Sequence, residues 1–300
     1  MDRFEQLKTR LAEGCPELEL RSAEPMSGHT SFRIGGPVKL MALPANAQQA
    51  VCAVRAAAEV GIVPFFMGNG SNLLVRDVGV ERFVIKTSGM KNCTIDGTAV
   101  TAECGITLAR LAVQARDAGL TGLEFAHGIP GSLGGAVTMN AGAYDGEMAQ
   151  VVTAVTCLNA DGSIEEVTEF DFAYRHSAFS DGSRMILSAR MELAPGDPTA
   201  IAARMDELAA RRRDKQPLEY PSAGSMFKRP AGYFAAALID QCGLKGLQVG
   251  GAQVSEKHAG FVVNRGGATC ADVLTLVEQV RQRVHEATGV ELEMEVKVLG

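Results

Sequence analysis

The sequence predicts an α+β fold, and three patterns support this class. A strand–helix–strand unit of about 50 residues lies near the N-terminus, hairpin-linked strands follow in the middle, and helices dominate the last third. The pattern changes near residue 80 and again at the Pro-rich linker 195–198. We therefore expect three subdomains, at residues 1–80, 81–197 and 198–300.

The first subdomain should contain a leading helix over 1–14, a strand over 38–43, a helix over 46–59 and a strand over 63–66. Phe4, Leu7 and Leu11 recur at helical spacing in the first of these. Asn46 is a good N-cap residue for the second helix. A loop rich in glycine follows the last of these strands.

The second subdomain should be mostly strands, with one helix. We expect strands over 82–86, 92–95, 99–103, 151–159, 163–168 and 184–192. Asp96-Gly97 and Asp161-Gly162 are typical hairpin turns between adjacent strands. Thr107 should cap a helix that ends near Ala118, before a stop at Gly119.

The third subdomain should contain helices over 199–213, 233–241 and 270–288, and a closing strand over 291–298. Period-2 alternation in that strand places Glu291, Glu293, Glu295 and Lys297 on one face. Such a pattern indicates a solvated face, and it does not single out one glutamate.

Composition excludes several classes of protein. An apolar content of 46% and a charged content of 21% are typical of a globular protein without membrane spans. No apolar run approaches the roughly 20 residues of a membrane helix, and the charged first residues do not resemble a secretion signal, so we expect no membrane insertion and a cytoplasmic location. The net charge of −6 argues against nucleic-acid binding. Residues 199–300 nevertheless hold 13 Lys and Arg against 12 Asp and Glu, so we expect an anionic substrate there.

The seven cysteines are scattered and form no metal-binding pattern. There is no CxxC and no zinc-type spacing with histidine. Most of these cysteines lie among apolar residues, so we expect reduced, core-filling thiols and no metal.

Two loops of Gly, Ser and Asn carry the main functional signal. The first holds Gly68, Asn69, Gly70, Ser71 and Asn72, and the second extends over 128–144. Glycine lets a backbone approach a ligand closely, and Ser and Asn add neutral donors, a combination that suits a diphosphate. Two such loops favour a dinucleotide-like ligand held between them, although both could be ordinary turns. The sequence has neither a complete GxGxxG with its acidic partner nor a P-loop.

The same loops, with several later motifs, resemble the UDP-N-acetylenolpyruvoylglucosamine reductase family. The matching segments are 68–72, 128–135, 139–144, 174–177, 224–230, 259–264 and 295–300. They cover the chain from about Ser31 to its end. The short connection 179–182 resembles the shorter class of this family, which lacks the insertion that carries a lid tyrosine.

This resemblance implies a vanillyl-alcohol-oxidase-type FAD domain, made of the first two subdomains, and a C-terminal substrate domain. FAD would be bound without a covalent link, between the two loops. The residues that this resemblance implies for FAD binding are Gly68, Asn69, Gly70, Ser71, Asn72, Gly128, Gly131, Ser132, Gly134, Asn140 and Gly142. His127 is interpreted as structural, or at most as a neighbour of the flavin.

The implied reaction reduces UDP-N-acetylglucosamine enolpyruvate to UDP-N-acetylmuramate for peptidoglycan synthesis, and so serves cell-wall biogenesis, cell shape and cell division. NADPH would reduce the flavin, and the flavin would pass hydride to the enolpyruvyl methylene carbon. Arg175 would stabilise the resulting enolate, Ser225 would protonate it, and Glu295 would polarise the carboxylate or order the site. From the residues alone, Arg175 could be a surface ion-pair partner and Ser225 a turn residue.

Substrate contacts are implied for Tyr174, Lys215 and Arg229. Arg229 stands where longer relatives have Asn, so its contact with uridine or phosphate stays open. The basic run 211–213 could equally be favourable charge at a helix C-terminus. We expect a monomer. A flavin oxidase of the same fold is the alternative enzyme, and a catalytically silent nucleotide-binding module is the alternative of another class.

Overall fold

A computed structural model describes residues 2–300. Its contacts divide the chain into two compact units, which are described separately below. Unit 1 comprises the chain up to Ser22, Leu40–Asn69 and Arg82–Arg211, and unit 2 comprises Ala23–Lys39, Gly70–Glu81 and Arg212–Gly300. The predicted three-part division stays a prediction. The predicted α+β class is confirmed by the mixture of helices and strands.

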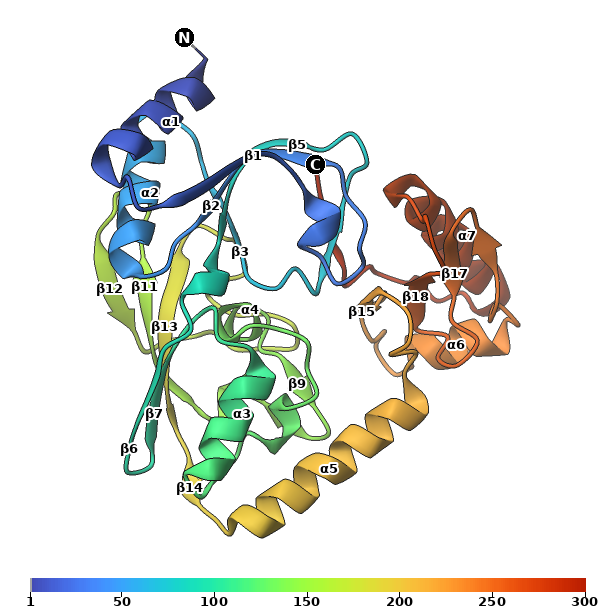
Figure 1. The fold of residues 1–300 in the computed structure, drawn as a ribbon. Helices are drawn as coiled ribbons and strands as arrows, with labels where there is room; N and C mark the ends of the chain where they lie inside the picture. The colour runs from blue at the N-terminus through green and yellow to red at the C-terminus, as the bar shows by residue number, and fades with distance from the viewer. Residues whose placement is uncertain (1) are drawn as a thin grey trace. The chain divides into compact units, whose positions relative to one another are not determined.

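Two packed helices open unit 1. α1 (Arg3–Gly14) lies beside α2 (Ala47–Glu59), and both match the predicted ranges (Figure 1). Leu7 and Leu11 of α1 are fully buried, as the helical spacing predicted. The Asn46 side chain accepts a hydrogen bond from the Gln49 N–H at 3.0 Å, so the predicted cap of α2 is confirmed.

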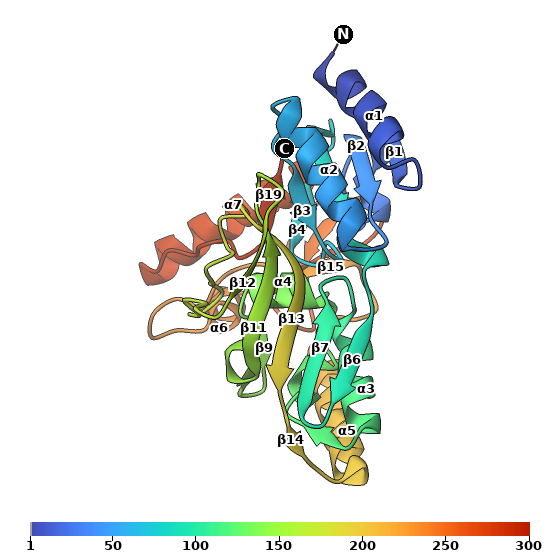
Figure 2. The same ribbon diagram turned by 90° about the vertical axis from the view of Figure 1, so that its left-hand side faces the viewer.

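Two sheets follow. The first has the order β1-β2-β5-β3 and consists of β1 (Glu19–Pro25), β2 (Pro37–Leu43), β5 (Val80–Lys86) and β3 (Phe65–Met67). The second is antiparallel and has the order β12-β11-β13-β7-β6 (Figure 2). Its strands are β12 (Ile164–Val167), β11 (Val152–Leu158), β13 (Met185–Glu192), β7 (Ala99–Glu103) and β6 (Cys93–Asp96). All strands of the two sheets except β1 were predicted. β3 begins at Phe65, two residues later than expected, and Val63, which was predicted to lie in this strand, is exposed.

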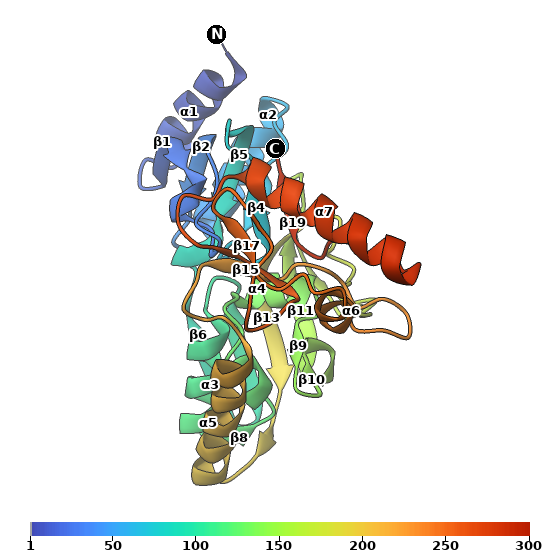
Figure 3. The same cartoon turned by 90° about the vertical axis from the view of Figure 1, so that its right-hand side faces the viewer.

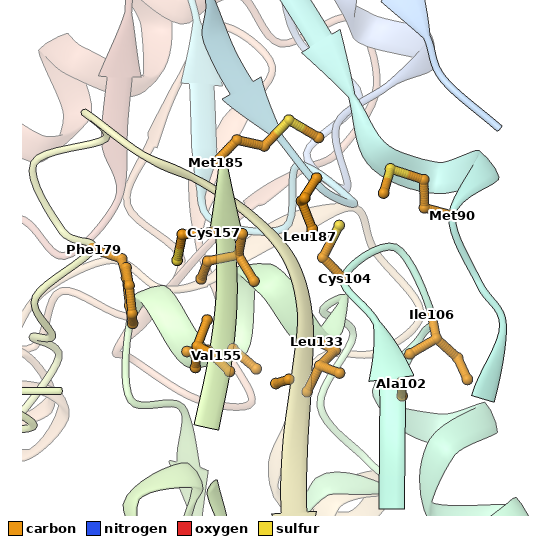
Figure 4. Close-up of a cluster of buried hydrophobic side chains, with 14 of the residues drawn as sticks. Met90, Ala102, Cys104, Ile106, Leu133, Val155, Cys157, Phe179, Met185 and Leu187 are labelled. Carbon is orange, nitrogen blue, oxygen red and sulfur yellow. The ribbon is translucent and has the colours of Figure 1, made fainter. Parts of the chain in front are cut away.

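The core of unit 1 lies where this second sheet meets two helices. α3 (Leu108–Asp117) is capped by Thr107 as predicted, whereas α4 (Leu133–Thr138) lies inside a segment that the glycines had predicted to be a loop. Buried side chains of β11, β13 and α4 converge there, including Val155, Leu187 and Leu133 (Figure 4). Burying each such side chain contributes about 1.5–3 kcal/mol, which holds α4 against the sheet.

Several short elements complete the fold. They are η1 (Met26–Gly28), β4 (Leu73–Val75), η2 (Thr87–Gly89), β8 (Leu120–Thr121), η3 (Glu124–Ala126), β9 (Gly142–Ala143), β10 (Gly146–Glu147), η4 (Met148–Gln150) and β14 (Ala194–Pro195). The long helix α5 (Pro198–Lys215) covers the helix predicted over 199–213. Among residues 2–300, no helix has the length and apolar character needed to cross a membrane.

Unit 2 is built on a small antiparallel sheet with the order β15-β18-β17-β16. Its strands are β15 (Ser222–Ser225), β18 (Phe261–Asn264), β17 (Ala252–Val254) and β16 (Gln248–Val249). α6 (Ala235–Gln241) and α7 (Cys270–Thr288) belong to the same unit, and α7 lies along β17 (Figures 1 and 3). α7 matches its prediction, whereas the four strands were missed.

Segments from the N-terminal part of the chain complete the core of unit 2. Phe32, Ile34 and Leu74 are all buried in the cluster formed by β18, α6 and α7. The Asn264 side-chain amide donates to the Phe32 carbonyl at 3.1 Å and ties that segment to β18. The C-terminal region alone therefore does not contain its whole hydrophobic core.

The predicted closing strand over 291–298 is wrong in its extent. Only β19 (Lys297–Leu299) is a strand, and it pairs in parallel with β4. Leu292 and Val296 are buried, as the alternation predicted, but Val298 is 39% exposed. The segment before β19 instead makes separate backbone contacts, which place Glu295.

Buried thiols give the first testable prediction. Burial raises the pKa of Cys104 to about 12 and that of Cys157 to about 11. Because the thiolate is the reactive form, we expect Ellman's reagent at pH 8 to modify neither thiol in the native protein and both after denaturation. Peptide mapping by mass spectrometry would measure this, with the less buried Cys15 as an internal reference. Rapid labelling of native Cys104 would contradict the packing described here.

Candidate cofactor and active site

The two glycine loops meet at Gly68 and Ser132. Gly68 directly follows β3, and Ser132 directly precedes α4. A Cβ atom on Gly68 would lie 2.0 Å from the Ser132 Oγ and 3.2 Å from its Cβ. A larger residue at position 68 would therefore force the Ser132 hydroxyl to rotate or the two loops to separate. The expected proximity of the two loops is therefore present within unit 1.

Ser132 has a buried hydroxyl with no partner among the described residues. The side chain is 2% exposed, and it does not cap α4. A buried hydroxyl without a partner is costly, so such a group indicates a ligand or ordered water. The Nδ1 atom of His127, just before the second loop, is also buried and has no partner within 2–300. A neutral hydroxyl beside a glycine backbone fits an FAD diphosphate.

Other residues of the second loop have structural partners. The N–H groups of Leu133 and Gly134 donate to the carbonyls of Ile106 and Cys104, at 2.9 and 2.8 Å. A Cβ on Gly134 would lie 2.9 Å from the Cys104 Cβ, so glycine lets α4 pack closely. The Gly131 carbonyl accepts the Leu108 N–H at 3.1 Å.

The end of the second loop is also engaged by the protein. Gly142 pairs with Glu147 between β9 and β10. Asn140 is 2% exposed, and its side-chain amide contacts two backbone groups described below. Gly128 is half-buried. Contacts of Gly128, Asn140 and Gly142 with FAD stay predictions, as do those of Gly131 and Gly134.

Tyr174 and Arg175 occupy the tip of a tight turn in unit 1. Ala173 and His176 close the turn through reciprocal backbone hydrogen bonds of 3.2 and 3.1 Å. Tyr174 is 55% exposed, and the Arg175 guanidinium lies 5.1 Å from the centre of its ring. β13 begins at Met185, soon after this turn, so no inserted domain or lid separates them.

Within unit 2, the rest of the first loop contacts the segment of Glu295. Gly70 has a left-handed φ of 63°, and its carbonyl accepts the Ser31 N–H at 3.3 Å. The Asn72 side-chain amide donates to the Glu295 carbonyl at 3.1 Å, and the Lys297 N–H donates to the Asn72 carbonyl at 3.0 Å. Asn69 and Ser71 are half-buried. Asn72 thus places Glu295.

Backbone pairing in unit 2 also places Ser225 near Glu295. The Glu295 N–H donates to the Met226 carbonyl at 2.9 Å, and Phe227 forms a bridge with Met294. Ser225 is exposed at the end of β15, opposite Phe261. An irregularity between Ser222 and Ser225, with a φ of 80° at Gly224, turns the strand at this point.

A neutral histidine supports the same pairing. The His258 Nδ1 accepts the Gly260 N–H at 3.2 Å, and the Gly260 carbonyl in turn accepts the Met226 N–H at 2.8 Å. Burial lowers the pKa of His258 below its ordinary value, and Lys245 lowers it further. His258 therefore holds the backbone beside Ser225 as an uncharged acceptor. No sequence pattern indicates this residue, because only its position in the folded chain gives it a role.

The basic residues differ in their partners. Lys228 forms an ion pair with Glu293, and Arg211 pairs with Glu207 at 2.5 Å on its own helix. Arg211 thus has an ion-pair partner on its own helix, and a substrate contact of the basic run 211–213 stays a prediction. Lys215 is exposed at the end of α5.

Arg229 stacks on an aromatic side chain that the sequence analysis did not single out. Its guanidinium lies 4.4 Å from the centre of the Phe234 ring, and Phe234 is 61% exposed. A flat cation over an exposed ring offers a surface for a planar or anionic ligand group. Among residues 2–300, no cluster of three or more His, Cys, Asp and Glu side chains could hold a metal ion.

Comparisons with known proteins agree with this site. Residues 38–168 match the model of the FAD binding domain, and residues 216–299 match the UDP-N-acetylenolpyruvoylglucosamine reductase C-terminal domain. A plant BBE-like 1 protein from Physcomitrella patens shares the fold at 15% identity, with a TM-score of 0.50, over 63% of this chain and 44% of that one. The fold and the site thus define an FAD-dependent oxidoreductase.

Full-length relatives then show the family. UDP-N-acetylenolpyruvoylglucosamine reductase of Pediococcus pentosaceus is 47% identical over 97% of both chains, and that of Syntrophomonas wolfei is 48% identical over 95% of this chain and 96% of its own. The crystal structure of the Thermus caldophilus reductase matches with a TM-score of 0.80 at 36% identity, over 95% of this chain and 99% of that one. The chain belongs to the UDP-N-acetylenolpyruvoylglucosamine reductase family.

Proposed function

We propose that this protein reduces UDP-N-acetylglucosamine enolpyruvate to UDP-N-acetylmuramate, with NADPH as the reductant, in the synthesis of peptidoglycan precursors. The observation that carries this proposal is the backbone pairing of Met226 and Phe227 with Met294 and Glu295. It brings Ser225 near Glu295 although the two are far apart in the sequence. A cytoplasmic monomer with non-covalently bound FAD belongs to the same proposal.

FAD, when bound, supplies the hydride that reduces the enolpyruvyl methylene carbon. We assign FAD contacts to both glycine loops. The assigned residues are Gly68, Asn69, Gly70, Ser71, Asn72, Gly128, Gly131, Ser132, Gly134, Asn140 and Gly142. The unpartnered Ser132 hydroxyl supports this assignment most strongly.

Arg175 is proposed to bind the substrate carboxylate. A guanidinium offers two parallel N–H donors to a carboxylate and keeps its charge at every physiological pH. As further negative charge develops on the enolate, this fixed positive charge stabilises it more than it stabilises the singly charged carboxylate of the substrate. Tyr174 lies beside the guanidinium and would contact the same part of the substrate.

Ser225 is proposed to donate the proton that completes the reaction. A serine hydroxyl is a weak acid, but an enolate carbon is basic enough to accept its proton when the two are aligned. Glu295 would order the substrate carboxylate from the neighbouring segment. Lys215 and Arg229 would bind the UDP diphosphate or uridine, and the Arg229–Phe234 stack supports a contact with a planar ring.

Anaerobic reoxidation of the reduced flavin tests this function. The protein is first reduced with NADPH in the absence of oxygen, and UDP-N-acetylglucosamine enolpyruvate is then added while flavin absorbance is followed. We expect rapid reoxidation with formation of UDP-N-acetylmuramate. Reoxidation by oxygen alone would favour an oxidase, and purified protein without flavin would favour a nucleotide-binding module.

A further inference from the structure

The turn that carries Arg175 has a backbone conformation that needs support. Arg175 has a φ of 55°, in the left-handed region that side chains other than glycine rarely adopt. Two backbone hydrogen bonds between Ala173 and His176 close the turn. Because the turn is short and strained, contacts from neighbouring segments contribute to fixing where the guanidinium lies.

Asn140 supplies one such contact from the second glycine loop. Its Nδ2 donates to the Ala173 carbonyl at 3.3 Å, and its Oδ1 accepts the Ala149 N–H at 2.9 Å. The side chain is 2% exposed, and its own φ of 42° is one that asparagine tolerates well. Both ends of the amide are therefore engaged by the protein backbone, one at Ala149 and the other at Ala173 in the turn of Arg175.

Ser177 supplies a second contact, on the other side of the turn. Its Oγ donates to the Thr138 carbonyl at 2.8 Å, and Ser177 is 1% exposed. The Ser180 Oγ donates to the same carbonyl at 3.1 Å and accepts the Ser177 N–H at 2.9 Å. Thr138 ends α4, so this contact ties the turn to the helix that follows Ser132.

We infer that Asn140 and Ser177 are positioning residues for Arg175, and that Asn140 acts on the substrate step through this turn. The inference rests on the proposed function, because it gives Arg175 a carboxylate to bind. A bidentate pair depends on the guanidinium lying in one place, and misplacement by about 1 Å can cost roughly a hundredfold in rate. The second glycine loop, which contains Ser132, thus also holds the turn of the proposed substrate-binding arginine through Thr138 and Asn140.

The chemistry of Asn140 allows a selective test. In Asn140→Asp, one carboxylate oxygen still accepts the Ala149 N–H, whereas the other replaces the donor that faces the Ala173 carbonyl and repels it. Ser177→Ala removes the contact with Thr138 and the acceptor of the Phe179 N–H, and it leaves Asn140 intact. Ser183→Ala is the matched control, because the Ser183 hydroxyl contacts only the exposed Asp181 in the same stretch of chain.

The experiment uses the FAD-loaded protein and follows the two half-reactions separately. For Asn140→Asp and Ser177→Ala we expect at least a tenfold loss in reoxidation by the enolpyruvyl substrate, mostly as a higher KM. In Ser177→Ala, whose side chain is not assigned to FAD, flavin reduction by NADPH should stay within about twofold of wild type. In an Arg175→Ala background, adding Asn140→Asp should change reoxidation no further. In Ser177→Ala, equal loss in both half-reactions or loss of FAD would overturn the inference, as would additive effects of Asn140→Asp and Arg175→Ala.

Hydrogen exchange gives a readout that does not depend on turnover. The His176 amide, which donates to Ala173, should exchange faster in Asn140→Asp and Ser177→Ala than in Ser183→Ala. Unchanged exchange would overturn the inference. If wild type does not use the enolpyruvyl substrate at all, the proposed function fails, and the exchange rates alone then decide whether the two residues hold the turn.

Discussion

Replacing Ser225 by alanine is expected to leave NADPH-driven flavin reduction at the wild-type rate and to slow formation of UDP-N-acetylmuramate by about 10²–10⁴-fold. Ser225 lies exposed at the end of β15, so loss of its hydroxyl leaves no buried group unpaired and no cavity in the core. The whole effect should therefore appear in the step that consumes the proton. Rapid mixing of the reduced protein with substrate, under anaerobic conditions, measures that step alone.

Ser222 provides the control at the other end of the same strand. Ser222 is paired with Val263, and its carbonyl, which the substitution keeps, accepts the Ser31 hydroxyl at 2.7 Å. Ser222→Ala should therefore retain both half-reactions. Loss of both half-reactions in Ser225→Ala would show that this residue supports the fold or the flavin, and would exclude it as the proton donor.

Replacing Gly68 by alanine is expected to lower the affinity for FAD by at least about tenfold, which corresponds to about 1.4 kcal/mol. The added methyl group would lie 2.0 Å from the Ser132 Oγ, so either the hydroxyl rotates away or the two loops separate. Either movement removes the arrangement that we assign to the diphosphate. Titration of the apoprotein with FAD, followed by flavin fluorescence, measures the change.

A second substitution separates crowding from binding. In Gly68→Ala with Ser132→Ala, the shortest remaining contact is 3.2 Å, to the Ser132 Cβ, so thermal stability should recover while FAD affinity stays low. Gly28→Ala is the control, because an added methyl group there has nothing within 4 Å. Wild-type FAD affinity in Gly68→Ala would contradict the assignment of this loop.

Elements defined by neighbouring residues could be predicted from the sequence. The caps at Asn46 and Thr107 are local hydrogen bonds, and both form as expected. The hairpin turns at Gly97 and Gly162 require a positive φ, which both glycines adopt. α7 begins at a capping box and ends at a left-handed Gly289, so its bounds are set by nearby residues as well.

Elements defined by distant partners could not be predicted. α4 consists largely of poor helix formers, and it forms because the Ile106 and Cys104 carbonyls accept its first N–H groups and the sheet buries Leu133. β15 is four residues long and irregular, and its partner β18 follows after 35 further residues. No periodicity within 222–225 indicates such pairing.

The candidate site shows the same division. Glycine and serine content located the two loops, and Gly68 and Ser132 do meet. Period-2 alternation could not distinguish Glu295 from Glu291 and Glu293; only the family resemblance selected it. The structure adds a physical distinction, because the Glu295 backbone alone of these three is held by both Met226 and Asn72.

The way the chain is shared between the two units limits how it can be divided. The chain passes from one unit to the other after Ser22, Lys39, Asn69, Glu81 and Arg211, and Phe32, Ile34 and Leu74 fill the core of unit 2. A fragment that starts at Arg212 would expose the apolar surfaces that these three side chains cover. The C-terminal part therefore cannot be exchanged between relatives as an independent domain. Evolution or engineering could exchange it only together with Ala23–Lys39 and Gly70–Glu81.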